Sequence, residues 1–281
     1  MEPKIAVLTP VFNEEERISF MLDSLLKQSV KPSKVIIGNN DSTDRSLEIA
    51  QNILKPSGID FSIINIKRYS ELGKWNINNV YWHLNKTLEE TSSNIDYVAV
   101  IESDVVIEKR YFEKLIPYFH KDPRLCITAG TLEPIGLNDD SFPLDKIKIM
   151  LWGSNRLYKG NHWLKLNNIS DIRKLASWDF DHILLTLSMG NYVYPIPCAM
   201  SWTFRNVSYF RGIMKGVADA YHGLPFWWVI YKTVRKKDFS YFIGYLRTKS
   251  KIKESDPVSD ELAKIYQYAA LRTFKRKILV S

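Results

Sequence analysis

The sequence is poor in the features that mark secreted and membrane-spanning proteins. It contains only two cysteines, Cys126 and Cys198, both among apolar neighbours, which favours reduced core residues over a disulfide. No apolar run approaches the roughly 18 residues that a membrane span needs. Residues 1–4 carry no apolar signal core and lead directly into a predicted strand. We therefore expect a cytoplasmic protein.

Most of the chain also lacks a net charge. The formal net charge of the 281 residues is +8. Residues 232–281 alone hold 13 Lys and Arg against 5 Asp and Glu, so the first 231 residues are neutral overall. A basic segment of this kind suits phosphates, whether in lipid headgroups, in nucleic acid or on an acidic partner.

The first 130 residues contain short apolar runs that alternate with segments of helical periodicity. Predicted strands lie at residues 4–8, 34–37, 61–66 and 97–101. Predicted helices lie at residues 14–28, from the turn at 38–44 to about 54, at 74–90 and at 108–120. This repetition predicts an α/β fold with a mostly parallel central sheet and helices on both faces.

Later segments give a weaker pattern, and one helix end is marked by a possible cap. Residues 131–177 look rich in loops. One helix is predicted from about residue 179 to 189, ended by Gly190, and further helices from about residue 211. At the first predicted helix, Asn13 has the side chain of an N-cap.

Two carboxylates follow the fourth predicted strand. Glu102 and Asp104 come directly after the apolar run 97–101, and Ser103 separates them. Carboxylates are rarely buried without a partner, so we expect a cation here: a divalent metal, a lysine or the positive group of a ligand. Open α/β sheets bind ligands at the carboxyl ends of their strands, which is where this pair lies.

Polar joints also follow the first two predicted strands. Residues 9–15 form a strand–proline–helix joint, and residues 38–44 form a turn of small and polar residues that can present N–H groups to a ligand. Each joint alone is equally typical of an ordinary surface turn. Together with Glu102 and Asp104 they predict a polar ligand site at one edge of the sheet.

These motifs resemble those of the family 2 glycosyltransferases, which have the nucleotide-binding GT-A fold. Pro10–Glu15 is similar to the family's first turn, Asn39–Asp44 to its acidic second turn, and Gly73-Lys74 to its glycine–lysine helix start. Glu102-Ser103-Asp104 is similar to its carboxylate-x-carboxylate motif. Residues 179–190 are similar to a family helix that begins with acidic residues and ends at a glycine.

The resemblance covers about residues 4–210 and implies a domain organisation. A GT-A domain would occupy residues 1–210, with a donor-binding half at about 1–130 and an acceptor-binding half at about 131–210. Residues 211–281 would form a basic, aromatic and helical C-terminal extension.

The resemblance also implies an activity, namely inverting, metal-dependent transfer of a hexose-type sugar from a nucleotide-diphosphate donor to an acceptor hydroxyl. Asp104 would bind Mg²⁺ or Mn²⁺. Asp179 would be the catalytic base, with Asp181 as its competitor. The donor-binding residues would be Thr9, Pro10, Glu14, Asn39, Asn40, Lys74, Glu102 and Ser103. The acceptor-binding residues would be Trp152, Trp178, Asp181 and Trp202. A UDP-sugar is favoured over a GDP-sugar as donor, and the acceptor would be a glycan or a lipid-linked molecule.

The chain departs from the family pattern in four places. Asn39 and Asn40 replace an acidic pair, Glu102 is one methylene longer than the usual first acid, Trp178 replaces a glutamate, and Trp202 stands where a histidine often binds the metal. Asp104 is therefore expected to share its metal with the donor phosphates and water. Other histidines that could serve instead, though each is more typically structural, are His162, His182 and His222.

Two other functions stay open beside this one. A GT-A domain that has lost catalysis could serve as a binding module, which the four departures allow. A sugar-phosphate nucleotidyltransferase shares the sheet, but it needs a glycine- and arginine-rich loop after the first strand, and residues 9–12 contain no glycine.

The C-terminal extension predicts a membrane contact. The apolar and aromatic residues 224–231 directly precede a basic cluster at residues 232–237. Such a combination can lie among anionic headgroups, so we expect residues 224–253 to contact an anionic surface, peripherally on the inner face of the membrane. The alternative is a helix packed on the domain with a solvated basic face. No stacking motif indicates nucleic-acid binding.

Overall fold

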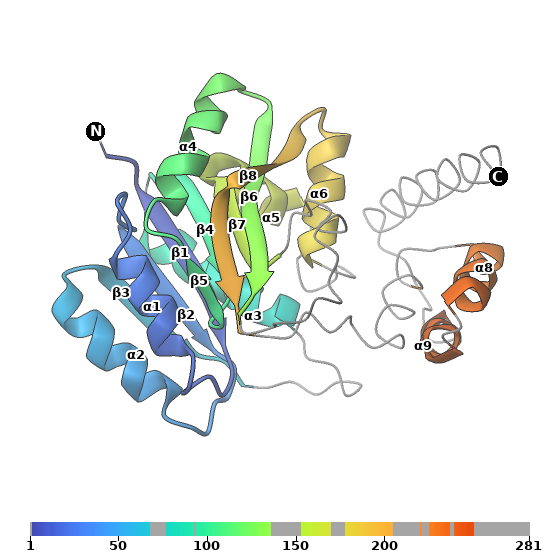
Figure 1. Cartoon of the computed structure of the whole chain (residues 1–281), viewed down its shortest axis with the longest axis horizontal. Helices are drawn as coiled ribbons and strands as arrows, with labels where there is room; N and C mark the ends of the chain where they lie inside the picture. Colours follow the sequence, from blue (N-terminus) through green and yellow to red (C-terminus); the bar gives the residue numbers. More distant parts are fainter. Residues whose placement is uncertain are drawn as a thin grey trace. The chain divides into compact units, whose positions relative to one another are not determined.

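The computed structural model describes residues 2–67, 77–92, 94–135, 153–169, 178–204, 220, 225–236 and 239–249 (Figure 1). Within these ranges, eight strands form one sheet in the order β3-β2-β1-β4-β7-β6-β8-β5. The strands are β1 (Ile5–Val11), β2 (Lys34–Asn39), β3 (Asp60–Asn65), β4 (Tyr97–Ile101), β5 (Val105–Ile107), β6 (Leu125–Pro134), β7 (Asn155–Lys159) and β8 (Tyr192–Thr203). The helices are α1 (Ile18–Leu26), α2 (Ser46–Leu54), the short η1 (Lys55–Ser57), α3 (Ile77–Thr91), α4 (Tyr111–Lys121), α5 (Gly160–Ile169), α6 (Trp178–Ser188), α8 (Phe226–Lys236) and α9 (Phe239–Lys249).

The first four strands form the parallel half of the sheet. β1 pairs in parallel with both β2 and β4, and β2 pairs in parallel with β3. Every residue of β1, β2 and β4 is buried, as expected for parallel strands with helices on both faces. The sequence therefore predicted this half correctly, because a strand that is buried on both faces has a continuous apolar sequence.

The second half of the sheet is mixed, and the sequence did not predict it. β7 pairs antiparallel with β4 and β6, β6 pairs parallel with β8, and β5 pairs antiparallel with β8. The segment 131–177 was expected to be rich in loops, but it contains the end of β6, all of β7 and the helix α5. β7 is five residues long and includes Asn155, Arg156 and Lys159, so only pairing with its neighbours reveals it as a strand.

Helices cover both faces of the sheet. Apolar side chains of α1, α2 and α4 share one buried cluster with β1, β2 and β4. α3 contacts β1 and β2, where Gly38 permits a close approach: a Cβ at this position would lie 2.9 Å from Val80 Cγ1. The Trp163 indole N–H of α5 donates a 2.8 Å hydrogen bond to Asn85 Oδ1 of α3.

Two local expectations are wrong. α1 begins at Ile18 after Arg17, so Asn13 does not cap it; Asn13 has a φ of 51° and takes part in a loop contact described below. Cys126 is buried, and burial raises the pKa of its thiol, but Cys198 is exposed rather than in the core. Both cysteines are free thiols.

The chain divides into two compact units. The first comprises Met1–Arg173 and Thr186–Asn206, and the second comprises Lys174–Leu185 and Val207–Ser281, so the division runs through α6. The sheet belongs entirely to the first unit. In the described part of the chain, every helix is too short or too polar to cross a bilayer.

A buried polar network fixes the mixed half of the sheet to α4. The Tyr111 hydroxyl donates to the Asn155 carbonyl at 2.6 Å and accepts from the Gly130 N–H at 2.7 Å. The Asn155 amide donates to Ser201 Oγ at 2.8 Å. Tyr111 is fully buried, and this burial raises the pKa of its phenol well above its ordinary value. One hydroxyl therefore joins β6 and β7 beneath α4.

We expect Tyr111→Phe to lower the free energy of unfolding by about 1–3 kcal/mol, because it leaves a buried N–H and a buried carbonyl without this partner. Urea denaturation measures the change. Tyr118→Phe on the same helix is the matched control and should change stability by less than about 0.5 kcal/mol. Equal effects of the two substitutions would contradict the importance of this network.

Candidate active site

The strand order brings the three predicted polar segments to the same edge of the sheet. β1 lies between β2 and β4, and all three run in the same direction (Figure 1). Val11 pairs with Asn39, so the joints that follow β1 and β2 begin at the same level. Glu102 follows β4 directly. The carboxyl edge of the sheet therefore collects Thr9, Asn39 and Asp104, as the sequence predicted.

The joints after β1 and β2 hold each other in place. The Asn13 N–H donates to Ser42 Oγ at 3.1 Å, and the Thr43 N–H donates back to Asn13 Oδ1 at 2.9 Å. Asn13 and Asp41 have φ values of 51° and 64°, in the left-handed region that Asn and Asp tolerate better than most residues.

Acidic and hydroxyl side chains add a second set of cross-links. The Glu14 N–H donates to Ser46 Oγ at 2.8 Å, and the Glu15 N–H donates to Asp44 Oδ2 at 3.0 Å. Partial burial raises the pKa of Asp44, but hydrogen bonds from Ser46 and from the Glu15 N–H outweigh it and hold this pKa below its ordinary value. Asp44 is thus a structural carboxylate that fixes the shape of the edge.

The two asparagines of the second turn have different surroundings. The Asn39 carboxamide donates to Asn65 Oδ1 at 2.9 Å and accepts from the Ser42 N–H at 3.0 Å. Asn40 is also buried, its N–H donates to the Val11 carbonyl, and among the described residues its carboxamide has no hydrogen-bond partner. Asn39 therefore positions the turn, and Asn40 has the side chain better placed to contact a ligand.

Two residues of the first joint are buried polar groups. Thr9 is fully buried, and the described residues offer its hydroxyl no hydrogen-bond partner. Glu14 is 4% exposed, and its carboxylate accepts a 3.1 Å hydrogen bond from Arg17 Nη1. Pro10 continues β1 and pairs with Gly38.

Asp104 is held from two directions. Its side chain is 1% exposed, and Oδ2 accepts a 3.0 Å hydrogen bond from the Thr203 hydroxyl. Its main-chain carbonyl accepts from the Phe204 N–H at 3.1 Å. Glu102 is half-buried and Ser103 is buried beside it. The end of β8 therefore fixes the carboxylate that follows β4.

Thr203 was missed by sequence reasoning, because β8 itself was missed. The predicted metal-histidine position, Trp202, pairs with Val106 of β5 and Glu133 of β6, and its neighbour Thr203 is the residue that reaches Asp104. The alternation of small and aromatic residues in 201–204 is the signal that could have indicated the end of a strand here.

Among the described residues, Asp104 could hold a metal ion only together with ligands from another molecule, such as a bound donor. Within these ranges, no three His, Cys, Asp or Glu side chains gather in a group that could hold a metal ion. The Asp104 carboxylate is a hard oxygen ligand of the kind Mg²⁺ and Mn²⁺ prefer. His162 donates to or accepts from Thr186 Oγ1 at 2.8 Å, and burial followed by nearby Lys165 and Lys159 lowers its pKa to about 4, so it is a neutral structural histidine.

The remaining candidates lie at the start of α6, in the part of this helix that belongs to the second unit. α6 begins at Trp178, so Asp179 and Asp181 both occupy its first turn, where the helix dipole favours a negative charge. Asp181 is 1% exposed, whereas Asp179 is half-buried and more accessible to an acceptor. Trp178 is buried and packs edge-on against His182 with ring centroids 5.7 Å apart. Trp152, Lys74 and His222 lie outside the described residues.

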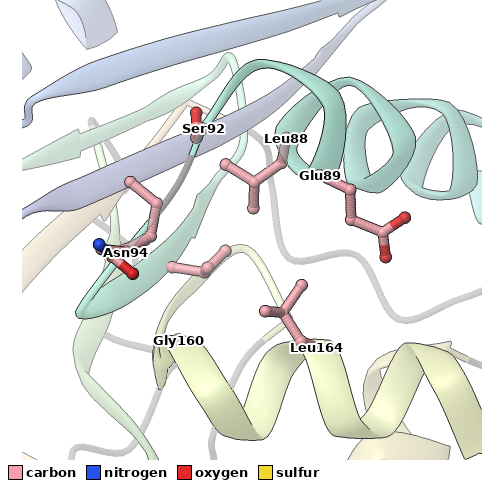
Figure 2. Close-up of a pocket in the computed structure, with 8 residues that line it drawn as sticks. Leu88, Glu89, Ser92, Asn94, Gly160 and Leu164 are labelled. Carbon is pink, nitrogen blue, oxygen red and sulfur yellow. The ribbon is translucent and has the colours of Figure 1, made fainter.

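A small cavity lies elsewhere on the first unit. It has a volume of about 160 Å³ and lies between the end of α3 and the start of α5, at the amino end of β4 (Figure 2). Leu88 and Leu164 face each other across it, and Glu89 lies at its rim. Because it is at the opposite end of β4 from Asp104, it does not belong to the candidate active site.

Comparison with known proteins relates this chain to a family. The family model for glycosyl transferase family 2 matches residues 6–181. Glycosyltransferase GlyA of Streptococcus pneumoniae is 31% identical over 115 residues, which are 41% of this chain and 15% of that protein. A poly-beta-1,6-N-acetyl-D-glucosamine synthase of Staphylococcus epidermidis is 28% identical over 126 residues, 45% of this chain and 28% of the synthase. The chain thus matches less than a third of the length of either relative.

Solved structures share the fold at low sequence identity. Residues 1–349 of S. aureus TarS, in complex with UDP-GlcNAc, superpose with a TM-score of 0.55 at 16% identity, covering 77% of this chain and 64% of that one. The mannosyltransferase PcManGT from Pyrobaculum calidifontis, in complex with GDP-Man and Mn²⁺, gives 0.58 at 14% identity, covering 96% and 81%. The mixed sheet is therefore the GT-A fold that the sequence predicted. With the family model matching more than half of its residues, the chain belongs to glycosyl transferase family 2.

Proposed function

We propose that this chain transfers a sugar from a nucleotide-diphosphate donor to an acceptor hydroxyl, with inversion at the anomeric carbon. The observation that carries the proposal is the buried Asp104 carboxylate at the end of β4, held by Thr203 beside the joints of β1 and β2. Because burying a charge is costly, a carboxylate at this edge supports a site for a cation or a ligand. Family membership supplies the reaction class.

The donor would bind along the joints of β1 and β2. Thr9 and Asn40 are buried polar groups with hydrogen-bonding capacity left within the described residues, so they would contact the nucleotide. Asn39 would act through the turn that it fixes. A UDP-sugar is the favoured donor, and the structure of TarS with bound UDP-GlcNAc supports this choice. A GDP-sugar is the first alternative donor to test, because PcManGT is in complex with GDP-Man. The other predicted donor contacts are Pro10, Glu14, Lys74, Glu102 and Ser103.

Asp104 would hold Mg²⁺ or Mn²⁺ together with the diphosphate of the donor. When bound, such a metal offsets the negative charge that develops on the departing diphosphate. The Thr203 hydroxyl keeps one oxygen of Asp104 in a fixed place, as groups behind a metal ligand generally do.

Asp179 would take the proton from the acceptor hydroxyl. As this oxygen forms its bond to the anomeric carbon, the bond from that carbon to the diphosphate breaks, and the nucleoside diphosphate leaves with the electron pair. A single displacement with no protein nucleophile inverts the configuration. Asp179 is preferred over Asp181 because it is the more accessible of the two. Trp152, Trp178 and Trp202 stay predicted acceptor contacts for a glycan or a lipid-linked acceptor.

Substitution of the two carboxylates tests the mechanism. We expect Asp179→Asn to lower the rate of transfer by roughly 10²–10⁴-fold, the usual contribution of a general base, without weakening nucleotide binding. Asp104→Asn should remove transfer and also the response of donor hydrolysis to Mn²⁺. Release of UDP or GDP from their sugar conjugates is the measurement, with a thermal-shift titration of the donor alongside.

Asp181→Asn and Asp23→Asn serve as comparisons for these variants. Asp23 is exposed and pairs with Lys27 at 3.8 Å, so its substitution should leave transfer near normal. Near-normal turnover of Asp179→Asn would overturn the proposed base. If the wild-type chain binds donors but releases no nucleoside diphosphate under any condition, it is a binding module rather than an enzyme.

Thr203 provides a second test, as a positioning residue. We expect Thr203→Val to raise the Mn²⁺ concentration needed for half-maximal donor hydrolysis by roughly ten- to hundredfold, because it removes the hydrogen bond to Asp104. Thr203→Ser keeps the hydroxyl and should restore most of this response. If Ser and Val behave alike, the hydroxyl has no role in the site.

A further inference from the structure

Helices α8 and α9 form a hairpin whose inner face is well packed. Trp228 and Val229 of α8 share a buried cluster with Tyr241 and Tyr245 of α9. The Trp228 and Tyr231 rings stack with centroids 5.1 Å apart, and Phe226 contacts the ring of Phe242 at 5.8 Å between centroids. The hairpin thus buries large aromatic side chains on one side of each helix without needing those on the other.

The opposite side of each helix carries a stripe of exposed apolar residues. On α8 these are Trp227, Ile230 and Val234, at helical spacings of three and four, and Val234 is 70% exposed. On α9 they are Phe239, Ile243 and Leu246, at spacings of four and three, and Phe239 is 75% exposed. With Phe226, the two helices hold seven of the twelve large apolar residues that are exposed in the described ranges, so this concentration marks an interaction surface.

The charge of the two helices indicates what this surface binds. Neither α8 nor α9 contains an Asp or Glu, whereas together they carry five basic residues. These are Lys232, Arg235, Lys236, Arg247 and Lys249. Helices that combine apolar stripes with basic residues and no acidic ones complement a surface that is apolar inside and anionic at its rim, which is the chemistry of a bilayer with acidic phospholipids.

We propose that the α8–α9 hairpin docks the protein on an anionic lipid surface, with its apolar stripes among the acyl chains and its basic residues at the headgroups. Each helix has 11 residues, about 16 Å at the rise of an α-helix, so it lies in the interface and does not cross it. Trp227 in the exposed stripe of α8 suits this depth, since its ring is amphipathic. The inference stands on the second unit alone and is independent of the proposed transferase activity.

Co-sedimentation of the full chain with vesicles tests this docking. We expect binding to phosphatidylcholine vesicles that contain phosphatidylglycerol, and markedly weaker binding to phosphatidylcholine alone or at high salt. The double variant Ile230→Glu with Ile243→Glu should lower the partition coefficient by roughly tenfold or more, because it places charge in both stripes. The double variant Arg235→Gln with Arg247→Gln should remove most of the salt-sensitive part of vesicle binding.

Leu187→Glu is the matched control. Leu187 is 46% exposed, close to the 43% and 44% of Ile230 and Ile243, but it belongs to the first unit. Its substitution should leave vesicle binding unchanged. Failure of the wild-type chain to bind anionic vesicles at low salt would overturn the proposal and mean that another segment of the chain covers the stripes. Loss of self-association in the double variant, with vesicle binding intact, would instead make the hairpin an interface between copies.

Discussion

The fold depends on one electrostatic constraint, a carboxylate buried at the end of a central strand. Asp104 is 1% exposed, and a buried carboxylate needs hydrogen-bond partners or nearby positive charge to offset its desolvation. The end of β8 supplies one such hydrogen bond through the Thr203 hydroxyl, which donates to Oδ2, and the Phe204 N–H donates to the main-chain carbonyl of Asp104. β8 reaches this place only because it pairs with β6 and β5, and β6 is fixed in turn by Tyr111 and Asn155. Strand pairing in the mixed half of the sheet therefore brings Thr203 within hydrogen-bond distance of Asp104.

A second level of order lies in the joints of β1 and β2. Several of their hydrogen bonds run from one joint to the other, as in the reciprocal pair between Asn13 and residues 42–43. Two turns that would be mobile separately thus become one preformed surface, which lowers the entropy lost when a ligand orders it. The replacement of the acidic pair by Asn39 and Asn40 fits this arrangement, because a carboxamide both donates and accepts. Asn39 accepts from Ser42 within the turn and donates to Asn65 at the end of β3.

The second unit is stabilised differently from the first. Its hairpin is stabilised by aromatic packing on one side and leaves apolar side chains in water on the other, which is unfavourable for an isolated domain. Of the 13 basic residues that composition located in the last 50 residues, five lie on these two helices. The proposed docking would remove these apolar side chains from water.

The sequence by itself determined the parallel half of the fold and the place of the acidic cluster. Apolar runs buried on both faces are legible without any partner, and the carboxyl ends of such strands must share one edge, so Thr9, Asn39 and Asp104 could be grouped from local pattern. It could not reveal β7 or β8, whose polar and proline-containing segments become strands only through pairing with distant residues. For the same reason it assigned Asn13 to a helix cap and overlooked Thr203. Only the tertiary structure decided which side chains support Asp104, because a hydrogen bond between residues 99 positions apart leaves no trace in local periodicity.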